Sequence, residues 1–282
     1  INAHWKKLQR YGESIMVLIG LGNAGCKIVE RFSDKYKKIT IDAGSELTEC
    51  SSPELYEQEA HKAKHLLEFE EDECYFFVCG AGKVSGATLA LLETIKHKKI
   101  NLVYIYPEEI MLSPMQQKLN KVAFNVLQEY ARSGLLNSMY LMCNETISTI
   151  LPYITIENIF EHTNDAIVNV FENLIFYLDQ KPILGSHHDP KEISRIRTIE
   201  YGEFQGNKKN LYFPLDNVTE TCYINIVSDE DMKNNKDLLN QIKQKIIEDK
   251  ENNVLSSFVV FKSDYEGSFY YAIRFTHYLQ KK

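Results

Sequence analysis

Five short apolar runs alternate with amphipathic stretches along the first half of the chain. The amphipathic stretches carry apolar residues at helical spacing and lie at 53–69, 87–96 and 114–132. Each apolar run has about the length of a strand that is covered on both faces, and the runs lie at 15–19, 38–41, 75–79, 102–106 and 139–143. This alternation predicts a parallel α/β sheet of the Rossmann-like type.

The second half of the chain follows a different pattern. Apolar residues recur at helical spacing over 156–178, which predicts a long central helix of about six turns. After a polar break we expect one helix at 236–248 among strands near 197–201, 222–227, 258–262 and 269–276. This predicts a smaller α+β domain with a mixed or antiparallel sheet. We therefore divide the chain into an N-terminal extension (1–13), an α/β domain (14–155), a central helix (156–180) and a C-terminal α+β domain (181–282).

The composition argues against several classes of function. The 282 residues are 44% hydrophobic and carry a net charge of −7, which argues against a sequence-independent nucleic-acid binder because neutralising phosphates needs a basic surface. The apolar segments are too short to span a bilayer, and the start lacks the pattern of a signal peptide. Six cysteines without a Cys-x-x-Cys pair indicate reduced core thiols. We therefore expect a cytoplasmic protein with no membrane partner and no direct nucleic-acid partner.

A glycine-rich turn, Gly20-Leu21-Gly22-Asn23-Ala24-Gly25, follows the first apolar run and precedes a predicted helix. Glycines let backbone N–H groups approach a phosphate, and the start of the helix adds partial positive charge. The pattern predicts a phosphate site without naming the ligand. One alternative is an NAD-dependent Rossmann oxidoreductase, because Asp42 ends the second strand where an acid would hold the ribose. The other is a tight turn with no ligand.

A second small-residue turn separates these alternatives. It runs over 80–88 after the strand at 75–79, and two phosphate-type turns on neighbouring strands are unusual for a dehydrogenase. At this point the chain resembles the tubulin/FtsZ superfamily. The segment 22–28 is similar to the first nucleotide loop of tubulin, Gly-Gln-Ala/Cys-Gly-x-Gln-Ile. The segment 82–88 aligns with the signature Gly-Gly-Gly-Thr-Gly-Thr/Ser-Gly, of which Gly82, Ser85 and Gly86 keep the expected character.

Further matches extend the resemblance over about 14–278. Ser52-Pro53-Glu54 resembles the Asn-Pro-Glu loop beside the γ-phosphate, Asn144 lies in a match to Pro-Asn-Asp, and Asn164 matches the asparagine that faces the guanine base. The length fits the short phage- or plasmid-encoded members. The resemblance implies GTP or GDP, with Mg²⁺, as ligand of the α/β domain. The ligand residues it implies are Gly22, Asn23, Ala24, Gly25, Lys27, Gly82, Lys83, Ser85, Gly86, Asn144 and Asn164.

The resemblance also implies how the protein would act. Members polymerise head to tail, and acids from a loop of the next subunit complete GTP hydrolysis. That loop aligns with 187–192, which makes Asp189 and Glu192 the catalytic candidates and the chain itself the main partner, with any adaptor unknown. His187-His188-Asp189 is alternatively a metal site or an inert loop. Lys83 and Val84 replace signature glycines: their side chains either block a phosphate, which would leave a non-hydrolysing structural protein, or Lys83 contacts it.

Overall fold

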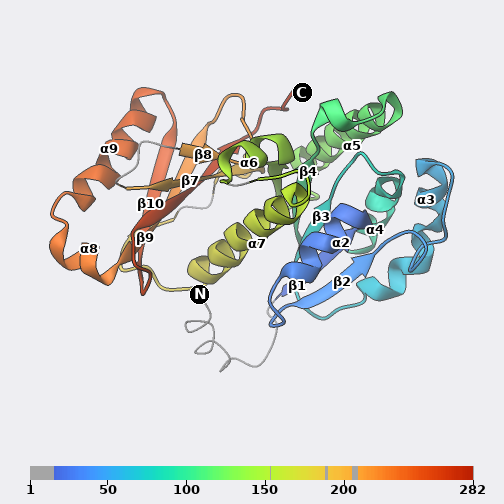
Figure 1. The fold of residues 1–282 in the computed structure, drawn as a ribbon, viewed down its shortest axis with the longest axis horizontal. Helices are drawn as coiled ribbons and strands as arrows, with labels where there is room; N and C mark the ends of the chain where they lie inside the picture. The colour runs from blue at the N-terminus through green and yellow to red at the C-terminus, as the bar shows by residue number, and fades with distance from the viewer. Residues whose placement is uncertain (1–15, 153, 188–189, 205–208, 282) are drawn as a thin grey trace.

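One continuous sheet runs through the molecule (Figure 1). The computed structural model describes residues 16–152, 154–187, 190–204 and 209–281. Eleven strands form the sheet in the order β2-β1-β3-β4-β5-β7-β11-β9-β10-β6, with β8 paired to β7. The first five are mutually parallel, as predicted, and they are β1 (Met16–Leu21), β2 (Lys37–Ile41), β3 (Glu73–Val78), β4 (Lys99–Tyr106) and β5 (Ser138–Cys143).

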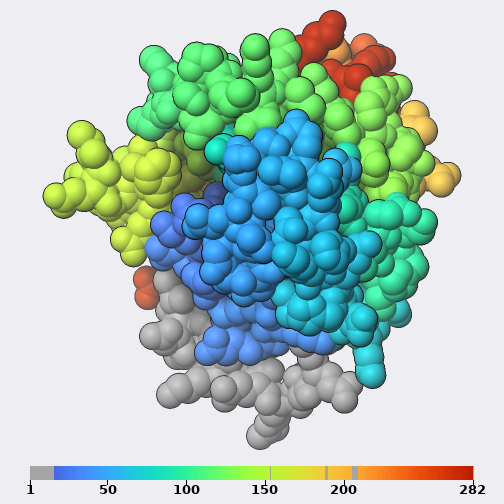
Figure 2. Space-filling model, turned by 90° about the vertical axis from the view of Figure 1, so that its right-hand side faces the viewer, coloured from blue at the N-terminus to red at the C-terminus, as the bar shows by residue number. Residues whose placement is uncertain are grey.

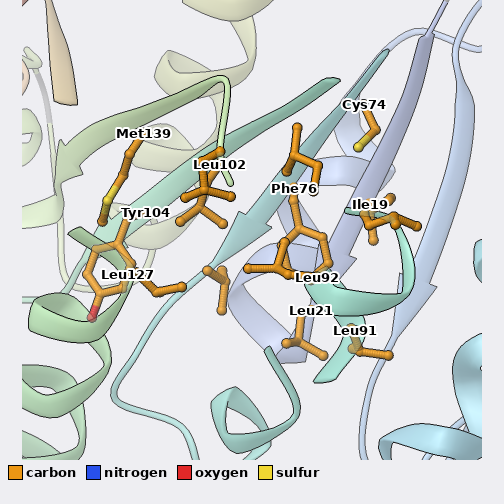
Figure 3. Close-up of a cluster of buried hydrophobic side chains, with 14 of the residues drawn as sticks. Ile19, Leu21, Cys74, Phe76, Leu91, Leu92, Leu102, Tyr104, Leu127 and Met139 are labelled. Carbon is orange, nitrogen blue, oxygen red and sulfur yellow. The ribbon is translucent and has the colours of Figure 1, made fainter. Parts of the chain in front are cut away.

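Helices cover both faces of the parallel strands, which explains why β1, β3, β4 and β5 are apolar over most of their length, whereas the edge strand β2 carries Lys37, Lys38 and Thr40. One face packs against α2 (Gly22–Arg31), α6 (Asn144–Ile150) and α7 (Ile159–Leu178). The other packs against α3 (Pro53–Glu59), the 3₁₀ helix η1 (Ala60–Leu67), α4 (Thr88–Thr94) and α5 (Pro114–Ser133). Figure 3 shows this second core, in which Phe76 and Tyr104 of the sheet meet Leu92 and Leu127 of the helices. Figure 2 is viewed from the β2 side of the sheet and shows the segment of α3 and η1 in blue facing the viewer, with α5 in green above it.

The C-terminal strands form a mixed arrangement, as predicted. β9 (Glu220–Ser228) and β10 (Leu255–Ser263) are parallel, whereas the other pairs are antiparallel. The remaining strands are β6 (Leu184–Ser186), β7 (Ile196–Glu203), β8 (Lys209–Leu211) and β11 (Phe269–Thr276), and the helices are α8 (Asp229–Asn234) and α9 (Leu238–Glu251). α7 packs on one face of these strands and α9 on the other.

The two halves of the sheet are joined directly. β7 pairs in parallel with β5 at Met139 and Tyr140, and the Met139 amide donates to the Arg195 carbonyl at 2.8 Å. The chain end adds a second link: the Gln280 amide donates to Gln128 Oε1 at 2.6 Å, and Gln128 Nε2 donates back to the Gln280 carbonyl at 3.2 Å. The two-domain division therefore stays a prediction, since one sheet passes through both parts.

Several predicted boundaries were wrong for local reasons. The central helix begins at Ile159 rather than Ile156, because residues 155–158 form a turn in which the Thr155 amide donates to Asn158 Oδ1. The helix predicted over 53–69 changes to 3₁₀ geometry at Ala60. The predicted extension at 1–13 lies outside the described residues. In the part of the chain that the structure describes, no helix has both the length and the apolar character to cross a bilayer.

Candidate nucleotide-binding site

The strand order predicts a ligand-binding crevice outside the carboxyl ends of β1 and β3. β2 and β3 flank β1 on opposite sides. The chain therefore continues from β1 to its neighbour on one side, β2, and then crosses to its neighbour on the other side, β3. The order 2-1-3-4-5 therefore switches at β1, and ligands of open parallel sheets bind outside the carboxyl ends of the strands at such a point. Both glycine turns lie there, because the first follows β1 and the second follows β3.

The first glycine turn is shaped for close backbone approach. Gly22 has φ +70°, a left-handed conformation that favours glycine. A Cβ atom at Gly25 would lie 2.3 Å from the Phe77 carbonyl oxygen, and one at Gly20 would lie 2.5 Å from the Gly25 carbonyl oxygen. These two glycines let α2 sit tightly on the sheet. The Leu21 side chain provides no cap to α2, so the first-turn N–H groups at Gly22, Asn23 and Ala24 are suited to bind an anion.

The second turn contains one open glycine. A Cβ atom at Gly82 would meet no atom of the described residues within 4 Å, whereas one at Gly86 would lie 2.0 Å from the Pro53 carbonyl oxygen. Gly86 thus serves packing against α3, and Gly82 leaves space open to solvent. Lys83 is exposed at the start of the 3₁₀ helix η2 (Lys83–Ala87). The Ser85 hydroxyl donates to the Gly80 carbonyl at 3.0 Å and so stabilises the turn.

The two turns face each other across the crevice. A Cβ atom at Gly22 would lie 3.8 Å from the Val84 Cβ. Val84, which replaces a signature glycine, therefore borders the first turn, while Lys83 and Gly82 lie outside this contact. The structure brings the two predicted phosphate turns together, and the side chain of Lys83 is free to reach a ligand between them.

Asn144 adds an unused acceptor at the same edge of the sheet. It follows β5 directly and begins α6. Its Oδ1 is buried and has no hydrogen-bond partner among the described residues, which is a costly state for a buried amide. A hydroxyl or N–H group of a bound nucleoside would satisfy this acceptor. Lys27 is exposed one turn into α2.

Asn164 lies on α7, half-buried. The next residue, Asp165, accepts a hydrogen bond from Arg31 of α2 at 2.9 Å, and Arg31 also contacts Glu161 at 3.5 Å. These ion pairs fix the first turns of α7 beside α2. The contact of Asn164 with a guanine base remains a prediction.

Asp42 is used within its own turn. Its Oδ1 accepts from the Ala43 amide at 2.8 Å, and its carbonyl accepts from the Leu47 amide at 3.1 Å. This carboxylate stabilises the turn after β2. Together with the strand order, this weakens the case for a dinucleotide site, since the dinucleotide-binding fold has the order 3-2-1-4-5-6.

The catalytic candidates lie elsewhere. Glu192 is exposed on the segment between α7 and β7, 3.7 Å from Arg195, and Asp189 lies outside the described residues. His187 and Glu192 line a cleft of about 680 Å³ together with Met16, Glu73 and Lys99, which lie at the amino ends of β1, β3 and β4. This segment is therefore at the edge of the sheet opposite to the glycine turns.

Known proteins match the chain by structure. No protein-family model and no curated protein matches the sequence. An empty dimer of FtsZ from M. jannaschii is 12% identical with a TM-score of 0.67, covering 98% of this chain and 92% of that one. TubZ of Bacillus thuringiensis serovar israelensis, in GDP-form protofilaments, is 13% identical with a TM-score of 0.73, covering 98% and 89%. The chain has the FtsZ/TubZ fold.

The FtsZ/TubZ fold confirms the fold that the sequence resemblance implied. The same TubZ is also known as a GTPγS-form protofilament, which is 14% identical with a TM-score of 0.72 over 93% of this chain and 88% of that one. At such identities the likeness rests on the arrangement of elements. The site residues therefore depend on the geometry described above. Sequence reasoning did not find the cleft at the amino ends, because its lining residues come from distant parts of the chain.

Proposed function

We propose that this protein binds guanine nucleotide in the crevice between β1 and β3, polymerises head to tail into filaments, and hydrolyses GTP where two subunits meet. One observation carries the proposal. The two glycine turns meet at the carboxyl edge of the sheet, whereas Glu192 lies on a segment at the amino edge. An acid placed there reaches a nucleotide only on another subunit that is stacked end to end.

The phosphates are assigned to the two turns. The first-turn N–H groups of α2, at Gly22 to Gly25, have no side-chain cap from Leu21, and the space beside Gly82 is open among the described residues. Lys83 would contact a terminal phosphate through its ammonium group, as P-loop lysines do. Lys27 completes the proposed phosphate site, while Ser85 and Gly86 shape the second turn beside it, Ser85 through its bond to the Gly80 carbonyl and Gly86 through its packing against Pro53. Bound Mg²⁺ would neutralise part of the phosphate charge.

The nucleoside is assigned to two asparagines. Asn144 offers its unpaired Oδ1 to the sugar or base. Asn164 offers an amide with two donors and one acceptor, which suits the edge of a guanine. The α/β part of the chain thus acts as the nucleotide-binding domain, and α7 connects it to the C-terminal domain.

Hydrolysis is assigned to the neighbouring subunit. Asp189 and Glu192 of that subunit would orient the attacking water and accept its proton. Polymerisation would then switch the reaction on, in the cytoplasm, with the chain itself as the main partner. The TubZ structures with GTPγS and GDP are both protofilaments, which supports the assembly part of this proposal.

A second candidate is a non-hydrolysing filament or interaction protein with the same fold. It is favoured by Val84, whose side chain borders Gly22 where the signature has glycine. A nucleotide held slightly further out by this side chain would still drive assembly and would resist hydrolysis.

Sedimentation with GTP, GDP, ATP or NAD tests these functions. The proposal predicts pelleting with GTP and accompanying phosphate release, while the non-hydrolysing alternative predicts pelleting without release. Asp189→Ala and Glu192→Gln are expected to keep GTP binding and pelleting and to lose turnover. Pelleting that no nucleotide changes would refute the proposal, and selective NAD binding would favour the oxidoreductase.

A further inference from the structure

Two tyrosines and an asparagine form a polar group inside the core between the sheet and α5. Tyr104 and Tyr106 of β4 are 0% and 2% exposed, and Asn120 of α5 is 1% exposed. Their surroundings are apolar, since both tyrosine rings pack on Phe124 at centroid distances of 5.3 and 5.1 Å. Polar groups in such a core destabilise the fold unless they are hydrogen-bonded, so each of the three needs a partner.

Asn120 lies between the two tyrosines. Its Oδ1 accepts a hydrogen bond from the Tyr104 hydroxyl at 2.7 Å, and its side chain also hydrogen-bonds to the Tyr106 hydroxyl. Tyr106 in turn donates to the carboxylate of Glu109, which is exposed. Figure 3 shows the Tyr104 hydroxyl directed from the sheet toward α5. The hydrogen bonds of Tyr106 therefore lead to the surface, whereas those of Tyr104 stay in the core.

Tyr104 also supports the second glycine turn. A Cβ atom at Gly80 would lie 2.1 Å from the Tyr104 hydroxyl oxygen, so the Gly80 backbone lies directly on that hydroxyl. The Gly80 backbone N–H hydrogen-bonds to it. Glycine permits this close approach because it has no Cβ. The hydroxyl thus connects the start of the turn to α5 through Asn120.

The rest of the second turn is tied to Gly80. The Ser85 hydroxyl donates to the Gly80 carbonyl and the Ser85 amide donates to the Gly82 carbonyl, both at 3.0 Å. Lys83 follows Gly82 directly and is exposed. A shift of Gly80 would therefore displace Gly82 and Lys83, the residues assigned to the terminal phosphate of GTP.

We propose that the Tyr104 hydroxyl, oriented by Asn120, is a positioning group that holds the second turn where it recognises the terminal phosphate of GTP. The inference rests on the proposed function and names a residue that sets its preference for GTP over GDP. The first turn is anchored by a different contact, that of Gly25 against the Phe77 carbonyl oxygen. Binding of the phosphates that GDP and GTP share should therefore survive the loss of this hydroxyl.

Tyr104→Phe removes the hydroxyl and keeps the ring. Calorimetric titration of unassembled protein should show that GTP affinity falls at least about tenfold, equivalent to about 1.4 kcal/mol, while GDP affinity changes by less than about twofold. The matched control is Tyr106→Phe, which removes one hydroxyl from a similarly buried tyrosine two positions along the same strand. It should lose stability in urea as Tyr104→Phe does, since each leaves a buried partner unpaired, and should keep the wild-type preference.

Asn120→Leu tests the same group from the side of α5. It removes the acceptor that orients the Tyr104 hydroxyl and leaves that hydroxyl in place. We expect GTP affinity to fall about three- to tenfold, with GDP affinity again within about twofold of the wild type. If Tyr104→Phe does not fold, this variant decides the question by the same two affinities.

The outcomes separate a positioning role from a structural one. Unchanged GTP affinity in Tyr104→Phe, or equal losses of GTP and GDP affinity, would overturn the proposal while the proposed function stands. The same selective loss in Tyr106→Phe would also overturn it, because any buried hydroxyl of β4 would then have this effect. A wild type that binds no guanine nucleotide would refute the proposed function itself, and the role of Tyr104 with it.

Discussion

Alanine at two glycines of the proposed site should have different effects: Gly25→Ala should lower stability, whereas Gly82→Ala should lower GTP affinity. Gly25→Ala would place its Cβ atom 2.3 Å from the Phe77 carbonyl oxygen, more than about 1 Å inside an ordinary contact. Because the obstacle is backbone, either α2 or β3 must move, and we expect a loss of about 1–3 kcal/mol in the free energy of unfolding. Gly82→Ala meets no described atom within 4 Å, and the backbone at φ −84° and ψ 145° suits alanine.

Gly82→Ala should therefore leave the free energy of unfolding within about 0.5 kcal/mol or raise it slightly. Its methyl group would instead fill the space that the proposed phosphate occupies. We expect GTP affinity to fall at least about tenfold, equivalent to about 1.4 kcal/mol. Urea denaturation gives the stability, and calorimetric titration of unassembled protein gives the affinity. An unchanged affinity in Gly82→Ala would refute the placement of the phosphate between the two turns.

Three further predictions follow from individual contacts. Asn144→Ala should weaken GTP binding without lowering the free energy of unfolding in urea, because it removes an acceptor that has no partner in the part of the chain that the structure describes. Gln128→Leu should cost about 1–3 kcal/mol in the same assay, because it leaves the buried Gln280 backbone groups unpaired. Burial raises the pKa of the Cys26 and Cys74 thiols from 9.0 to about 12. The unfolded chain thus loses these protons first, and the free energy of unfolding should fall by about 1.4 kcal/mol per thiol per pH unit as pH rises from 9 toward 12. Cys74→Ala should reduce that slope by one thiol, and an unchanged slope would contradict the assignment.

The main elements could be predicted because their patterns are long. The parallel strands β1, β3, β4 and β5 are apolar over most of their length, since helices cover both faces, and α5 and α7 each keep their helical spacing for 20 residues. The short elements β6, β8, α6 and α8 carry too few positions to show a period. The join between β5 and β7 depends on pairing between distant residues, and no local pattern predicts it.

The site could be predicted in part. Glycine spacing identified both turns, but only the structure separates Gly82, which faces open space, from Gly86, which packs against Pro53. Asp42 fitted a ribose contact by position alone, and its carboxylate proved to be used by the adjacent turn. Glu192 lies at the edge of the sheet opposite to the glycine turns, and only the topology of the whole sheet shows this.

Phosphate release measured over a dilution series at saturating GTP tests the central claim most directly. If hydrolysis is completed by the next subunit, the rate per subunit should be near zero below a critical concentration and rise to a plateau above it, while bound GTP per subunit stays constant. A rate per subunit that does not change with protein concentration would contradict the account, because it would mean that one subunit contains the complete site.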